Sequence, residues 1–155
     1  MKQWIHQLLL LGRDTSGSIM LEFALGSGVL IAAFTGTFQF GYTFLQYNNL
    51  RNAAVRGARY ASLAPYDSLT STPSAAFQTA ITNVVLYGDP GGGTSPVLPR
   101  LTAANVQLTV TFANDVPSSV TVSITGYSVD AIFSSFTFNM KPQVTYTYQG
   151  IWTPV

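Results

Sequence analysis

The longest uncharged stretch of the chain is a 28-residue segment from Phe23 to Leu50, and its first half is strongly apolar. At about 1.5 Å per residue this segment spans roughly 42 Å as a helix, more than the roughly 30 Å hydrocarbon core of a bilayer. The helical pattern continues to Ala61, and Pro65 stops it. We therefore expect one long helix over about residues 19–62, which leaves the hydrocarbon near residues 42–47, where aromatic side chains typically lie at the membrane surface.

A second helix is predicted between Pro73 and Gly88, because apolar residues recur there on one helical face. These residues are Ala76, Phe77, Ala80, Ile81, Val84 and Val85. Thr72 is expected to be the N-cap, Pro73 the first helical residue and Gly88 the residue past the end. The apolar face predicts that this helix packs on another element.

Four later stretches alternate between apolar and polar residues, which predicts β-strands. The stretches are residues 106–112, 120–125, 136–140 and 144–148. Residues 114–119 are expected to form a hairpin loop, and Pro142 an edge or a break. The predicted fold is α+β: a long N-terminal transmembrane helix followed by a small antiparallel sheet of three or four strands with one packed amphipathic helix. The region after the long helix is small, so the sheet is also expected to rest on the C-terminal half of that helix.

The chain ahead of the long helix does not resemble an ordinary secretory signal. Its short apolar run is followed by Arg13 and Asp14, where a small-residue cleavage site would be expected.

Composition argues against a freely soluble enzyme, because charged residues make up 8% of the chain and about 25% of a typical soluble domain. The chain has no cysteine, and its one histidine, His6, lies in the leader. No Ser-His-Asp triad or histidine metal site is therefore expected in the exterior domain. Its acids are interpreted as turn formers: Asp67, Asp89, Asp115 and Asp130. We expect no enzyme activity, no metal, no cofactor and no small-molecule substrate.

One acid, Glu22, stands at the entrance of the apolar segment, five residues after Gly17. A carboxylate costs about 2.5 to 3.5 kcal/mol at a bilayer centre and less near the surface, so an acid there usually has a partner. Cleavage after Gly17 would make Ser18 the new N-terminus, and its ammonium could pair with Glu22 of the same or a neighbouring chain. The alternative is that Glu22 only complements the positive end of the helix dipole.

Taken together, the basic leader, Gly17, Glu22 and the long apolar helix resemble a type IV prepilin. The segment Asn52-Ala53-Ala54-Val55-Arg56-Gly57-Ala58-Arg59-Tyr60-Ala61 is similar to the segment that follows the span in TadE-like pseudopilins of tight-adherence (Tad/Flp) pili. Within it the family motif comprises Arg56, Gly57, Ala58 and Arg59. The two motifs cover residues 13–61, and the remainder matches only as a strand-rich exterior region of the right size.

The resemblance implies that a dedicated prepilin peptidase cuts between Gly17 and Ser18 and that Glu22 is the assembly acid. It implies partners among other pilin or pseudopilin subunits, the pilus machinery and membrane lipid. It also divides the chain into a prepilin-type leader over residues 1–17, a long transmembrane or assembly helix over residues 18–62 and an extracytoplasmic α+β domain over residues 63–155. The resemblance further implies a single-pass protein of the bacterial inner membrane with a cytoplasmic N-terminus and a periplasmic or extracellular C-terminal domain. Lysine and arginine counts beside the span lean slightly against this orientation. The three arginines of residues 51–59 are too few to predict nucleic-acid binding, and headgroup contact explains them more simply.

Small residues recur every four positions in the first half of the span, namely Ala24, Gly28, Ala32 and Gly36. Such a stripe lets helix backbones approach closely in lipid. Phe34 and Phe38 lie on the opposite side of the helix. Close helix packing is therefore expected in the first half of the span, although a chance regularity is the alternative.

The sequence thus predicts a pseudopilin-like subunit that takes part in assembly of a Tad-type pilus or secretion apparatus after processing at Gly17. The alternative is an uncleaved, single-span membrane anchor that carries an exterior binding or adhesion module. A membrane-tethered hydrolase is a third, remote alternative.

Overall fold

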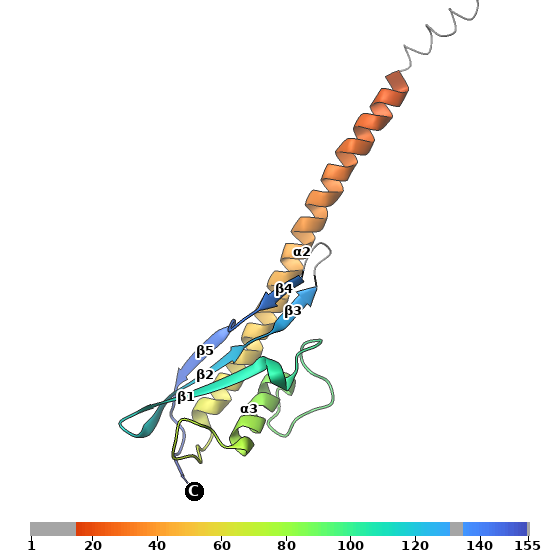
Figure 1. Ribbon diagram of the computed structural model, residues 1–155. Helices are drawn as coiled ribbons and strands as arrows, with labels where there is room; N and C mark the ends of the chain where they lie inside the picture. Colours follow the sequence, from red (N-terminus) through yellow and green to blue (C-terminus); the bar gives the residue numbers. More distant parts are fainter. Residues whose placement is uncertain (1–14, 131–134, 155) are drawn as a thin grey trace, which may run out of the picture. The chain divides into compact units, whose positions relative to one another are not determined.

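The computed structural model describes residues 15–130 and 135–154 (Figure 1). The chain divides into two compact units, of which the first ends at Gly41 and the second comprises Tyr42–Val155. The leader as far as residue 14, including His6, lies outside the described residues.

The predicted long helix is confirmed as α2, Thr15–Leu63. It ends at Leu63, two residues before Pro65. This is expected because a proline disfavours helical backbone at the residue before it. From Gly17 to Leu63 it is long and apolar enough to cross a membrane, by length and composition. In the first unit its large apolar side chains are exposed: Phe23 is 76% and Phe34 77% accessible. These observations are consistent with single-pass membrane anchoring.

The second helix is α3, Ala75–Tyr87. The predicted N-cap at Thr72 is wrong by two residues: Ser74 caps the helix, its Oγ accepting from the Phe77 N–H at 3.1 Å and donating to Asp67 Oδ2 at 2.7 Å. Pro73 therefore precedes the cap instead of opening the helix. Gly88 ends α3 as predicted, with a left-handed φ of 80°. The predicted amphipathic face is buried mainly through Phe77, Ile81, Val84, Val85 and Leu86.

The strands form two antiparallel sheets instead of one. After the 3-10 turn η1, Ala103–Asn105, a three-stranded sheet has the order β1-β2-β5, with β1 Val106–Ala113, β2 Val116–Ile124 and β5 Gln143–Thr147. A separate pair joins β3 Tyr127–Asp130 to β4 Ser135–Phe138. The predicted α+β class with a small antiparallel sheet is confirmed, but the stretch 136–140 belongs to the second pair, and β3 was not predicted.

The β1–β2 hairpin turn is tighter than the loop predicted over residues 114–119. Only Asn114 and Asp115 separate the strands, with φ values of 53° and 59°. Positive φ at both central positions is the requirement of the two-residue turns that match strand twist, and Asn and Asp tolerate it well. Pro117 lies in β2 opposite Phe112, beside the irregular register between Thr111 and Phe112, where a missing ladder N–H is tolerated.

The C-terminal half of α2 is part of the domain core, as expected for so small a region. Small residues form its buried face: Ala53, Ala54, Gly57, Ala58 and Ala61. They share one apolar cluster with residues of α3 and of the three-stranded sheet, including Ile81, Val120 and Val122. Figure 1 shows α3 beside the last turns of α2. The Val85 side chain packs so closely on α2 that a Cβ on Gly57 would lie 2.3 Å from Val85 Cγ2.

The C-terminal segment is hydrogen-bonded to the residues that follow α2. Tyr66 is fully buried, and its backbone pairs in parallel with Trp152. The Tyr148 hydroxyl donates to the Ala64 carbonyl oxygen at 2.9 Å, and Trp152 Nε1 donates to the Ser68 carbonyl oxygen at 2.9 Å. These contacts close the domain around the end of the long helix.

Replacing Gly57 by Ala is expected to destabilise the second unit by about 1 to 3 kcal/mol, because the buried, β-branched Val85 has little freedom to move away. In a Val85→Ala background the same change is expected to be stabilising, by about 0.5 to 1 kcal/mol, since alanine favours helix and the clash is gone. Denaturant unfolding of the four proteins of this double-mutant cycle in detergent, followed by near-ultraviolet circular dichroism, measures the reversal. The control is Gly41→Ala, where an added Cβ meets nothing within 4 Å. An equal loss of stability from Gly57→Ala with valine or with alanine at position 85 would contradict the close contact between Gly57 and Val85.

Alkaline pH is expected to destabilise the domain. Burial raises the pKa of the Tyr66, Tyr127 and Tyr148 hydroxyls above their usual value. The folded chain therefore keeps protons that the unfolded chain releases, so stability is complete below about pH 10 and falls as pH rises further. Thermal unfolding against pH measures this fall. It should shrink in Tyr148→Phe and persist in Tyr146→Phe, whose side chain is 37% exposed.

Candidate functional site

The predicted processing site lies in the first turns of the described part of α2. Gly17 and Ser18 are both exposed, and a Cβ on Gly17 would meet nothing within 4 Å. Neither residue is therefore covered by the described part of the chain.

Glu22 is exposed, and its apolar neighbours on the same face of the helix, Ile19 and Leu25, are also exposed, at 64% and 68% accessibility. The helix is already formed at Thr15, so Glu22 lies about two turns inside it. Helix-dipole stabilisation is confined to the first turn, so it does not reach Glu22 in the uncleaved helix. After cleavage at Gly17, Glu22 would lie about one turn from the new N-terminus, where the dipole alternative applies again. The described residues provide no ion pair to Glu22, whose carboxylate is left with an apolar neighbourhood and no cation.

The small-residue stripe lies in the first unit and is fully exposed. Ala24, Gly28, Ala32 and Gly36 are all exposed, and a Cβ on either glycine would meet nothing within 4 Å. Nothing in the described chain therefore requires glycine at these two positions. The nearby hydroxyls are satisfied on their own helix, where Ser27 Oγ donates to the Ala24 carbonyl oxygen and Thr37 Oγ1 to that of Ala33. Such internal pairing suits a helix in a solvent without hydrogen-bonding groups.

The family motif divides into a buried half and an exposed half. Gly57 and Ala58 are buried against the domain, whereas Arg56 and Arg59 are exposed. Arg56 Nη1 lies 3.7 Å from the position of a Cβ on Gly88, so its charge stands at the C-terminal end of α3, where a cation is favourable. Arg59 instead lines a cleft of about 340 Å³ beside the start of the C-terminal segment, together with Ser62, Tyr146 and Gln149.

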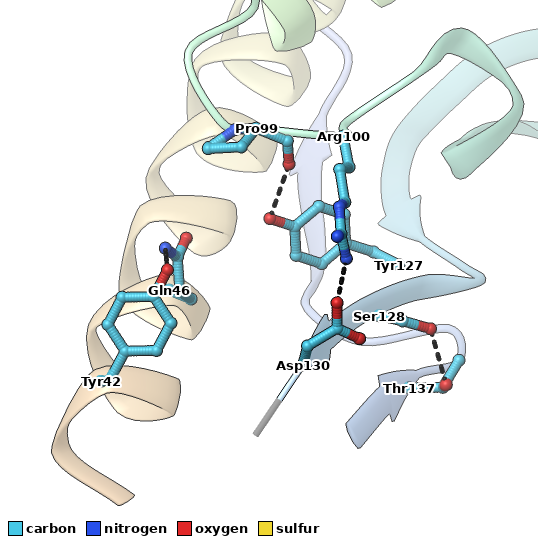
Figure 2. A network of polar contacts seen from close by, with 8 residues as sticks. All are labelled: Tyr42, Gln46, Pro99, Arg100, Tyr127, Ser128, Asp130 and Thr137. Carbon is cyan, nitrogen blue, oxygen red and sulfur yellow. Dashed lines mark hydrogen bonds and ion pairs between the residues drawn. The ribbon is translucent and has the colours of Figure 1, made fainter. Parts of the chain in front are cut away.

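A second polar cleft lies entirely within the C-terminal unit (Figure 2). Tyr42 and Gln46 of α2 face Tyr127 and Asp130 of β3, with Arg100 above them. Asp130 is not a turn former as predicted: it ends β3 and forms an ion pair with Arg100. The other exterior acids fit the prediction better, since Asp89 Oδ1 accepts from the Gly91 N–H and Asp115 occupies the hairpin turn.

Sequence reasoning missed this cleft because its parts lie far apart in the chain. Gln46 and Arg100 are 54 positions apart, and each is unremarkable alone. The non-glycine φ of 64° at Arg100 leaves no mark in the sequence. Within the described ranges no group of three or more His, Cys, Asp or Glu residues is arranged to hold a metal ion.

Residues 17–59 match the family model of the TadE-like protein family. This segment is TadE-like. The match begins at the predicted processing site and ends with the last arginine of the predicted motif, so it includes both of these features of α2. No curated protein and no solved structure matches the chain.

Because the stripe is exposed, we predict that larger side chains weaken helix association only when they lie on the face of the stripe. Leucine at Gly28 and Ala32 together should lower association several-fold in a bacterial two-hybrid assay of the membrane helix. The matched control is Gly26→Leu, which is equally exposed but lies on another face. Unchanged association in the double variant, or an equal loss in the control, would contradict the stripe.

Proposed function

We propose that this protein is a pseudopilin-like subunit that takes part in assembly of a Tad-type pilus or secretion apparatus after a prepilin peptidase removes residues 1–17. The observation that carries the proposal is the TadE-like match over residues 17–59 on a helix whose single acid, Glu22, has no cation among the described residues. The role is structural, without catalysis or a cofactor.

Cleavage would change the electrostatics of this helix. It would leave Ser18 with a free ammonium four residues before Glu22, which is about one helical turn. In a low-dielectric environment opposite charges attract strongly, and an unpaired charge is costly. Pairing between the ammonium and Glu22 of the same or a neighbouring subunit therefore favours assembly of the processed form over the precursor.

Close approach of the helices would then follow from the stripe of Ala24, Gly28, Ala32 and Gly36. Small residues let backbones meet without displacing bulky side chains, and such packing drives association in lipid. The same helix carries the C-terminal domain through its buried small residues. In the proposed orientation the N-terminus is cytoplasmic, the helix crosses the inner membrane and the domain is periplasmic or extracellular.

The scissile bond lies within helical backbone, so the peptidase must open the first turns. Glycine at position 17 lowers the cost of unwinding the helix there.

Intact-mass measurement on protein isolated from native membranes tests processing. A mass lacking residues 1–17 is expected. Full-length protein in functional membranes would contradict processing and favour the uncleaved anchor with an exterior binding module.

Affinity purification from the same membranes tests the assembly acid. Glu22→Gln keeps the size of the side chain and removes its charge, so co-purified pilin or pseudopilin subunits should be lost. Asp115→Asn is the control, because it makes the same kind of change in an exposed hairpin turn. Measuring the mass of each variant separates a failure of assembly from a failure of processing. Retention of all partners by the fully processed Glu22→Gln protein would contradict the assembly role.

A further inference from the structure

The polar cleft of the C-terminal unit encloses about 260 Å³ between α2, the loop before η1 and β3. Figure 2 shows Tyr42 and Gln46 on one wall and Tyr127 on the other, with Arg100 and Asp130 at one side. The Tyr127 hydroxyl is occupied, since it donates to the Pro99 carbonyl oxygen at 3.0 Å.

The cleft carries one positive and one negative group. Arg100 and Asp130 form an ion pair whose side chains are 70% and 61% exposed. An ion pair this exposed contributes little to stability in water. Each partner nevertheless keeps free hydrogen-bonding capacity, because a guanidinium has five N–H donors and a carboxylate about four acceptor sites. The geometry therefore suits a ligand that carries both charges.

Gln46 adds an unsatisfied acceptor to the wall. Its side chain is 9% exposed, and Nε2 donates to the Tyr42 hydroxyl oxygen at 3.0 Å. Its Oε1 is buried and has no donor among the described residues. Leaving a buried carbonyl without a donor is costly, so a ligand that brings N–H groups would be favoured here. The Tyr42 hydroxyl still has its own proton to donate.

The position of the cleft along α2 indicates where such a ligand comes from. The 19 residues from Phe23 to Gly41 carry no charge and make about 28 Å of helix, close to the thickness of the hydrocarbon core. Tyr42 is the next residue of the same helix. In the sequence, the cleft residues Tyr42 and Gln46 therefore follow directly on the uncharged segment, where residues of the headgroup layer are expected.

We propose that this cleft binds the phosphoethanolamine headgroup of a membrane phospholipid. The phosphate accepts from the Arg100 guanidinium and the Tyr42 hydroxyl, and the ammonium donates to Asp130 and to the Gln46 amide oxygen. A choline headgroup has no N–H to donate, and a glycerol headgroup has no cation to offset the Asp130 carboxylate. The inference goes beyond the assembly role and does not depend on processing after Gly17.

Native mass spectrometry of the full chain in detergent tests the preference. The protein is offered an equimolar mixture of phosphatidylethanolamine, phosphatidylcholine and phosphatidylglycerol with identical acyl chains. The ethanolamine lipid should be retained about tenfold over either competitor, the difference expected from one charge-assisted hydrogen bond. Equal retention of all three lipids, or a preference for the glycerol lipid, would overturn the proposal.

Charge variants locate the site. Arg100→Gln and Asp130→Asn should each abolish the preference, whereas Lys141→Gln and Asp115→Asn, comparable charge removals outside the cleft, should keep it. The exchange Arg100→Asp with Asp130→Arg retains an ion pair but reverses its direction, so it should also lose the preference. Unchanged near-ultraviolet circular dichroism shows that each variant is folded. A preference that survives the exchange, or that is lost equally in the controls, would contradict this location.

Discussion

The second unit depends on the close contact between α2 and α3 at Gly57. A Cβ there would lie 2.3 Å from Val85 Cγ2, so with valine at position 85 only glycine fits at position 57. Around this point the alanines at positions 53, 54, 58 and 61 complete a smooth buried face. A small domain thereby gains enough core by using the long helix as one of its walls. Half of the TadE-like motif is explained by this packing, and the arginines beside it are left for contacts outside the core.

One helix therefore carries two surfaces of different kinds. Up to Gly41 its large apolar side chains are exposed, and the hydroxyls of Ser27 and Thr37 donate to carbonyl oxygens of the same helix. After Tyr42 it supplies part of a polar cleft and then the small face of the core. Our proposals assign the first surface to lipid and to neighbouring subunits, and the cleft to the headgroup layer. The TadE-like segment, residues 17–59, includes parts of both surfaces.

The sequence predicts most of the elements because their signals are local. The uncharged segment, the apolar face that ends at Gly88 and the alternation over 106–112 each depend on residues a few positions apart. The errors have physical causes. Ser74 caps α3 instead of Thr72 because Asp67, seven residues away, holds its hydroxyl. The four residues of β3 are too few for a periodic signal, and their partner strand follows only after the segment 131–134. The cleft at Arg100 was missed because its walls come from three distant segments. Gly17 and Glu22, in contrast, are predicted from their spacing together with the basic leader and the long apolar helix around them.

The central claim is that processing creates a cation for Glu22. Solid-state nuclear magnetic resonance on assembled material from the native host, with ¹⁵N in the serine amine and ¹³C in the glutamate carboxylate, measures this contact directly. Our proposal predicts a charged Glu22 carboxylate within about 4 to 6 Å of the Ser18 ammonium, the range over which opposite charges stabilise one another. A Glu22 carboxyl that is protonated, or that has no amine within this range in a functional assembly, would contradict it.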